Sequence, residues 1–175
     1  LQNLMLQTSV CFDTETTGID SLNAELVGMS FSYEKGKAFY VPFPENKEEC
    51  QKQVDLFKEI FANEAIQKIA QNIKYDMSVL ANYGIEIKGD IYDTMLAHYL
   101  IEPEKRHNMD AMAMSYLNYE PMSIESLIGK KGKNQGSPAA AKNNCACIKR
   151  CFWCATSRSN RFGFSRSKRK RASCH

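Results

Sequence analysis

Two acidic residues, Asp13 and Glu15, lie one residue apart at the end of an apolar run that has the pattern of a β-strand. Because successive side chains of a strand point to opposite faces, both carboxylates share one face, while Phe12 and Thr14 point to the other. Adjacent carboxylates repel each other, and their burial is costly unless a cation lies between them. The pair therefore predicts a divalent metal site, although for these two residues alone a pairing with Lys or a turn-capping role is an equally good interpretation.

A second acidic site lies in the segment QNIKYD at residues 71–76, where a predicted strand enters a predicted helix. Asn72 is a favourable N-cap residue, and Asp76 falls near the first helical turn, where the partial positive charge of the helix end stabilises an anion. With Asp13 and Glu15, this gives three carboxylates at the ends of elements that could be neighbours in one sheet. Oxygen ligands select hard cations, so we expect Mg²⁺ or Mn²⁺ rather than zinc.

The elements that must position these carboxylates follow from the hydrophobic pattern. A strand ending near Glu15, an alternating segment and a third strand joined by a hairpin signal predict an antiparallel three-stranded meander. Helical spacing and further short apolar runs predict the later elements. The predicted strands are 25–33, 38–41, 65–71 and 91–92, and the predicted helices are 48–62, 73–83, 93–101 and 108–117. In the alternating segment, we expect Leu26 to share a face with Gly28 and Ser30. Three antiparallel strands followed by alternating helices and strands predict an α/β fold with a mixed sheet.

The charge of the chain divides sharply near Ser137. Residues 1–137 hold 13 Lys and Arg residues and all 20 Asp and Glu residues, a net charge of −7, whereas residues 138–175 hold the remaining 10 basic residues and no acid. We therefore expect a folded domain at 1–137 and a basic tail rich in Cys, Ser and Arg at 138–175 that cannot bury a core. Cys145, Cys147, Cys151 and Cys154 are spaced too closely for the usual zinc site.

The sequence also predicts where the protein works. No run approaches the roughly 20 apolar residues of a membrane span, and residues 1–10 lack the basic start and apolar run of a secretory signal. We therefore expect a cytoplasmic protein without membrane contact. The chain begins with Leu rather than Met, which suggests a fragment of a longer protein or an incomplete reading frame.

Six segments resemble, in order and spacing, motifs of the proofreading 3′-5′ exonuclease domain of bacterial DNA polymerase I. They are DTETTG at 13–18, QNIKYD at 71–76, YGIE at 83–86, YDTML at 92–96, RHNMD at 106–110 and GKNQ at 132–135. The resemblance covers about residues 10–135, and agreement of several ordered motifs argues against chance. It implies a ribonuclease H-like fold, truncated here at its C-terminal end.

The resemblance further implies a two-metal exonuclease that removes nucleotides from the 3′ end of single-stranded DNA, with the polymerase domain of the parent chain as its partner. Asp13, Glu15 and Asp76 would be catalytic and bind two Mg²⁺ or Mn²⁺ ions, one activating the attacking water and the other stabilising the leaving 3′ oxygen. Ile19 and Ile124 would pack against bases, and Tyr75 would stack on a base or form a hydrogen bond. Arg106 and the side-chain amides of Gln71 and Asn72 would contact phosphate and sugar. The complete set of implied substrate-binding residues is Thr14, Ile19, Gln71, Asn72, Tyr75, Arg106 and Ile124.

The chain departs from this family after GKNQ. The third family motif, a Tyr followed four residues later by the Asp that supplies the fourth metal ligand, is absent, because no acid follows Glu125. Asp93 and Asp110 belong to structural motifs of the family, so we do not expect either to replace it. A shifted reading frame after about Gln135 is the simplest account of the tail. A catalytically inactive exonuclease-fold scaffold or nucleic-acid-binding module and a ribonuclease D-like exoribonuclease are the alternative functions.

Overall fold

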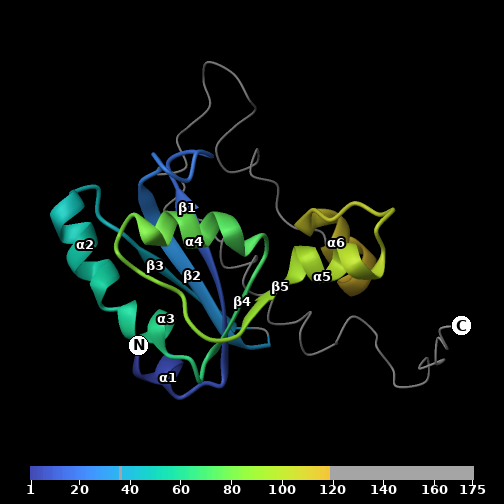
Figure 1. Ribbon diagram of the computed structural model, residues 1–175, viewed down its shortest axis with the longest axis horizontal. Coiled ribbons are helices and arrows are strands. Elements are labelled where there is room, and N and C mark those ends of the chain that lie inside the picture. The colour runs from blue at the N-terminus through green and yellow to red at the C-terminus, as the bar shows by residue number, and fades with distance from the viewer. Residues whose placement is uncertain (36, 119–175) are drawn as a thin grey trace, which may run out of the picture.

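The computed structural model describes residues 1–35 and 37–118. The predictions for Ile124, for the GKNQ segment and for the tail at 138–175 therefore lie outside the described residues. Within them, one five-stranded sheet has the strand order β3-β2-β1-β4-β5 (Figure 1). Its strands are β1 (Ser9–Thr16), β2 (Leu26–Glu34), β3 (Lys37–Pro42), β4 (Gln67–Ala70) and β5 (Ile91–Asp93). Strands β1, β2 and β3 are antiparallel, and β4 runs parallel to β1 and β5, which confirms the predicted mixed sheet.

The two faces of the sheet are covered by different helices. The helices are α1 (Gln2–Met5), α2 (Lys47–Asp55), α3 (Lys58–Ala62), α4 (Ile73–Ala81), α5 (Thr94–Ile101) and α6 (Met109–Leu117). On one face, Val10 and Phe12 of β1 join the larger core with residues of α1 to α4. On the other, Cys11 packs in a smaller core with Met112 and Ala113 of α6. Figure 1 shows α4 across the sheet and α5 and α6 beyond β5. The alternation along β1 thus decides which helices each side chain meets.

The predicted single helix at 48–62 is wrong, because the chain forms α2 and α3 with a tight turn between them. Leu56 N donates to Gln53 O at 3.3 Å and Phe57 N donates to Val54 O at 2.9 Å, the spacing of a 3₁₀ turn. Phe57 is buried and stacks on Phe31, with ring centroids 5.1 Å apart and planes at 6°. The turn thus directs Phe57 into the larger core, a tertiary contact that the helical pattern does not encode.

One helix boundary and the facing of one strand residue differ from the predicted ones. Helix α4 ends at Ala81 rather than at residue 83, and the chain reverses at Gly84, whose φ of +69° is available to glycine without strain. Leu26 does not share a face with Gly28 and Ser30, because the β1–β2 register shifts between Glu15 and Thr16 and places Leu26 in the larger core. Such a bulge re-aims one side chain.

Within the described residues, no helix combines the length and the apolar composition that crossing a membrane requires.

Candidate active site

The acid pair lies on β1, the middle strand of the sheet, on the face covered by α6. Asp13 is paired with Ser30 of β2 and Glu15 with Gly28, and Cys11 on the same face contacts α6. The side chain of Asp13 is buried and that of Glu15 is half-buried. The predicted sharing of one face by the two carboxylates therefore follows from the register of the sheet.

The chemistry of this pair suits a hard cation. Asp13 Oδ2 and Glu15 Oε1 are buried, and neither oxygen accepts a hydrogen bond within the part of the chain that the structure describes. Both residues take part in further interactions through their other atoms or their charge. Two neighbouring carboxylates at low exposure repel each other, and a divalent cation with a preference for oxygen ligands relieves that repulsion. The donor set thus fits Mg²⁺ or Mn²⁺ by its chemical type.

Asp76 is attached to the same strand, but through Thr14. Its Oδ1 accepts hydrogen bonds from Thr14 N at 2.9 Å and from Thr14 Oγ1 at 2.7 Å, and the side chain is 2% exposed. Thr14 points to the opposite face from Asp13 and Glu15. Among residues 1–35 and 37–118, no three His, Cys, Asp or Glu side chains form a group that could hold a metal ion. The structure therefore joins Asp76 to the strand of the acid pair without gathering all three carboxylates at one point.

Asn72 occupies the N-cap position of α4 as predicted, but it does not cap the helix with its side chain. Asn72 has φ 59° and ψ 50°, a left-handed conformation, and its side chain makes no cap hydrogen bond. Instead, Asp93 reaches across from the end of β5: its Oδ1 accepts from Asn72 N and its Oδ2 from Ile73 N, both at 3.1 Å. A carboxylate so placed satisfies helix-end N–H groups that have no partner within the helix. Asp93 therefore positions the start of α4, which carries Tyr75 and Asp76.

Tyr75 holds the turn that follows β1. Its hydroxyl donates to Gly18 O at 2.6 Å and lies 2.5 Å from Thr16 Oγ1. Ile19, the next residue of this turn, is 97% exposed. An isoleucine presented fully to solvent is available to pack against a ligand. The hydroxyl of Tyr75 thus fixes the turn, and the predicted contacts of both residues with nucleotides stay predictions.

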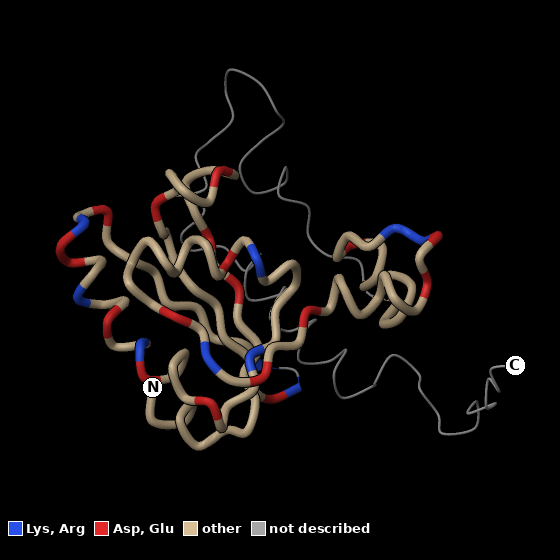
Figure 2. The backbone as a smooth tube through the Cα atoms, in the orientation of Figure 1, with Lys and Arg blue, Asp and Glu red and all other residues tan. Residues whose placement is uncertain are grey.

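Gln71 connects the site to the loop between α5 and α6. Its Nε2 donates to His107 O at 2.9 Å, and its Oε1 accepts from Thr94 Oγ1. Arg106, in the same loop, is exposed, and Figure 2 shows a short basic stretch there, next to acidic residues. The side chain of Gln71 is thus committed to internal contacts, whereas Arg106 is free to meet solvent or a ligand.

A contact between the buried His98 and the half-buried His107 was not singled out from the sequence as part of the site. Nδ1 of His98 lies 2.7 Å from Nδ1 of His107, and His98 is 1% exposed. The pKa of His98 is lowered from its ordinary value, chiefly by burial and next by the charge of His107. The two residues lie nine positions apart on different segments, so only the fold brings them together. The pair fixes the loop that carries Arg106.

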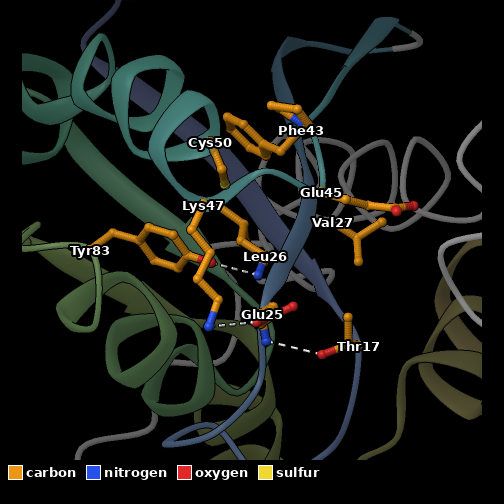
Figure 3. Close-up of a pocket in the computed structure, with 10 residues that line it drawn as sticks. Thr17, Glu25, Leu26, Val27, Phe43, Glu45, Lys47, Cys50 and Tyr83 are labelled. Atoms are coloured by element: carbon orange, nitrogen blue, oxygen red, sulfur yellow. Dashed lines mark hydrogen bonds and ion pairs between the residues drawn. The ribbon is translucent and has the colours of Figure 1, made fainter.

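A cavity of about 280 Å³ opens beside the start of the turn, between β2, α2 and Tyr83 (Figure 3). Figure 3 shows Lys47 Nζ on Glu25 Oε1, at 2.9 Å, and Tyr83 Oη accepting from Leu26 N, at 2.8 Å. Cys50 lines this cavity, and the pKa of its thiol is raised, chiefly by burial. Neither Asp13, Glu15 nor Asp76 lines this cavity. The candidate site is therefore the acid-bearing sheet face, not this cavity.

Comparison with known proteins identifies the family of this chain. Residues 1–146 match the profile of a family described as 3′-5′ exonuclease. DNA polymerase I of Pseudomonas aeruginosa is 37% identical over 133 residues, which are 71% of this chain and 15% of that protein. DNA polymerase I of Synechocystis is 38% identical over 127 residues, 66% of this chain and 13% of that protein. The chain thus spans about one seventh of the length of these relatives.

Solved structures share the fold at low sequence identity, among them that of an exoribonuclease. Escherichia coli RNase D, an exoribonuclease involved in structured RNA processing, has a TM-score of 0.66 at 13% identity, with 93% of this chain and 40% of that chain covered. Its likeness, at this identity, concerns the ribonuclease H-like fold alone.

Proposed function

This chain belongs to the 3′-5′ exonuclease family of DNA polymerase I, and we propose that it is the proofreading part of such a polymerase, hydrolysing the terminal phosphodiester at the 3′ end of single-stranded DNA. The observation that carries the proposal is that Asp13 and Glu15 share one face of the middle strand, where both are at least half-buried. In this proposal, the exonuclease domain acts together with the polymerase domain of the parent chain, in the bacterial cytoplasm.

The metal chemistry of this proposal falls to three residues. Asp13 and Glu15 would hold divalent ions directly, and Asp76 would join them from the start of α4, next to Thr14. When bound, two Mg²⁺ or Mn²⁺ ions supply a nucleophilic water at neutral pH and stabilise the leaving oxygen. Thr14 restrains Asp76 through two hydrogen bonds, so the orientation of this carboxylate depends on the strand that carries the other two acids.

The binding of the nucleic acid falls to residues around this face. The turn held by Tyr75 presents Ile19 for packing against a base, and Thr14 and Asn72, whose backbone N–H groups donate to Asp76 and Asp93, flank this face. Arg106 meets a phosphate from the loop that Gln71 anchors. These contacts orient the 3′ end so that the scissile bond lies at the acid pair.

A non-catalytic scaffold is the second candidate function, and two observations favour it. Within the described part of the chain, the three carboxylates are not assembled into a group that could hold a metal. No acid follows Glu125 to supply the fourth ligand of the family. A chain of this kind would retain the fold and bind nucleic acid without cutting it.

The deciding experiment is degradation of a 3′-labelled single strand, DNA against RNA, with Mg²⁺ or Mn²⁺. We expect DNA to be shortened from its 3′ end, and Asp13→Ala to lower the rate by about 100-fold or more, the usual cost of one group that stabilises charge in the transition state. Asp110→Ala, which removes an exposed acid of α6, is the matched control and should keep the full rate.

The outcomes separate the candidates. A rate unchanged by Asp13→Ala would contradict the exonuclease mechanism for this chain. Binding of the single strand without cleavage, with or without Asp13, favours the scaffold, and faster cleavage of RNA favours the exoribonuclease.

A further inference from the structure

Tyr40 of β3 lies on the same face of the sheet as the acid pair. Tyr40 is paired with Ser30 of β2, and Ser30 is paired with Asp13 of β1, so these three residues form one row across three strands. Directly paired residues of antiparallel strands point to the same face. Ala38, two residues before Tyr40, packs in the core that contains Cys11, which identifies the face independently.

The side chain of Tyr40 does not lie over its paired residue, Ser30, but extends over Gly28. A Cβ atom built on Gly28 would lie 2.2 Å from the hydroxyl oxygen of Tyr40, 2.4 Å from Cζ and 2.7 Å from Cε2. The phenol end of the ring therefore covers the α-carbon of Gly28. Gly28 is the residue paired with Glu15. The hydroxyl thus lies over the position directly opposite Glu15, one strand away from its carboxylate.

The two acids differ in what faces them across β2. Asp13 faces Ser30, whose own short hydroxyl occupies the paired position. Glu15 faces a residue without a side chain, and the space above that residue is taken by the phenol of Tyr40. Paired Cβ positions on neighbouring strands are about 5 Å apart, so a hydroxyl placed over one of them is within reach of the side chain at the other. A phenol donates a hydrogen bond to a carboxylate and adds no charge.

We propose that Tyr40 is a positioning residue of the exonuclease site: its hydroxyl donates a hydrogen bond to Glu15 and orients that carboxylate toward the metal ion. This inference rests on the proposed function for its metal and on the contact at Gly28 for its geometry. Partners that hold a metal ligand in place typically change metal affinity 10- to 100-fold when they are removed. Gly28 has a defined task in this arrangement, since any larger residue would displace the phenol.

The test is Mn²⁺ binding to the full 175-residue chain, followed by the electron paramagnetic resonance signal of the free ion. Tyr40→Phe removes one oxygen and keeps the ring, and we expect it to weaken Mn²⁺ binding about tenfold. Tyr33→Phe is the matched control, because Tyr33 lies on the same hairpin, packs against the larger core and stacks on Phe39. The control should bind Mn²⁺ within about twofold of the unmodified chain, and its melting temperature shows that the hairpin is intact.

Glu15→Gln separates a specific role from a general one. If Tyr40 acts through Glu15, Tyr40→Phe adds little further loss to Glu15→Gln. Gly28→Ala should reproduce the loss by moving the phenol. An affinity unchanged by Tyr40→Phe, or a loss equally large with and without Glu15, would overturn the proposal.

Failure of the metal site itself would be recognised separately. If the unmodified chain binds no Mn²⁺, or if Glu15→Gln binds it equally well, the metal-binding part of the proposed function is wrong. The contact between Tyr40 and Glu15 is then read from urea unfolding of the metal-free single and double variants. Non-additive effects of Tyr40→Phe and Glu15→Gln support the contact, and strictly additive effects overturn it.

Discussion

Replacement of Asp93 by alanine is expected to destabilise two helices at once. The carboxylate accepts hydrogen bonds from four backbone N–H groups at the starts of two helices. At α4 these are Asn72 N and Ile73 N, each at 3.1 Å, and at α5 they are Met95 N at 2.9 Å and Leu96 N at 3.2 Å. Asp93 is the N-cap of α5, while for α4 it replaces the cap that the side chain of Asn72 does not provide.

The expected loss follows from these contacts. Removing an Asp cap costs about 0.5–2 kcal/mol for one helix. Part of this cost is the interaction of the negative charge with the helix N-terminus, which is worth about 0.3–1 kcal/mol by itself. With two helix starts affected, Asp93→Ala should lower the free energy of unfolding by about 1–4 kcal/mol. That is a large fraction of the roughly 5–15 kcal/mol by which native domains are stable.

Urea unfolding followed by circular dichroism measures this loss. Asp110→Ala is the matched control, because Asp110 also lies in the first turn of a helix, is exposed, and belongs to a helix whose N-cap makes no side-chain hydrogen bond. The control should lose at most about 1 kcal/mol. A loss below about 1 kcal/mol for Asp93→Ala, or an equal loss for both variants, would refute the double-cap reasoning. Unchanged stability with abolished Mn²⁺ binding would instead identify Asp93 as a metal ligand.

Three further predictions concern stability. The pKa of His98 in the folded chain lies below its ordinary value of 6.5, so the unfolded chain takes up a proton more readily. The free energy of unfolding should therefore fall as the pH drops below 6.5, by at most about 1.4 kcal/mol per pH unit. His98→Gln should flatten this pH dependence in urea unfolding between pH 7.5 and 5.5, and an unchanged slope would contradict the reasoning. Phe57→Ala removes the ring stacked on Phe31 and should cost about 3–5 kcal/mol in thermal unfolding, against little change for the exposed neighbour Leu56→Ala. Asn46, whose Oδ1 accepts from Glu48 N and Glu49 N, caps α2, so Asn46→Ala should cost about 0.5–2 kcal/mol by the same method, whereas Asn46→Asp should be nearly neutral.

The strand pattern of this fold was predictable because it is local. Alternation along β1 placed Asp13 and Glu15 on one face, and the hairpin signal joined β2 to β3 as antiparallel neighbours. The break between α2 and α3 was not predictable in the same way. Residues 48–62 have continuous helical periodicity, and Phe57, at the break, stacks on Phe31 of β2, a partner that lies outside this segment. Periodicity reports which residues are buried, not which residue of another element they meet.

The same limit applies more strongly to the acids of the candidate site. Asp76, Asp93 and Asp110 each lie at or near the start of a helix, and the local sequence gives all three the same meaning: an anion at the positive end of a helix. The fold assigns them different tasks. Asp76 is bound by Thr14, 62 residues earlier; both carboxylate oxygens of Asp93 accept backbone N–H groups; and Asp110 stays exposed. Of these three helix-start acids, Asp76 alone is attached to the strand of the acid pair. Asp93 is therefore unsuited to replace the fourth ligand, because recruiting it to a metal would remove the caps of two helices, including the one that positions Asp76.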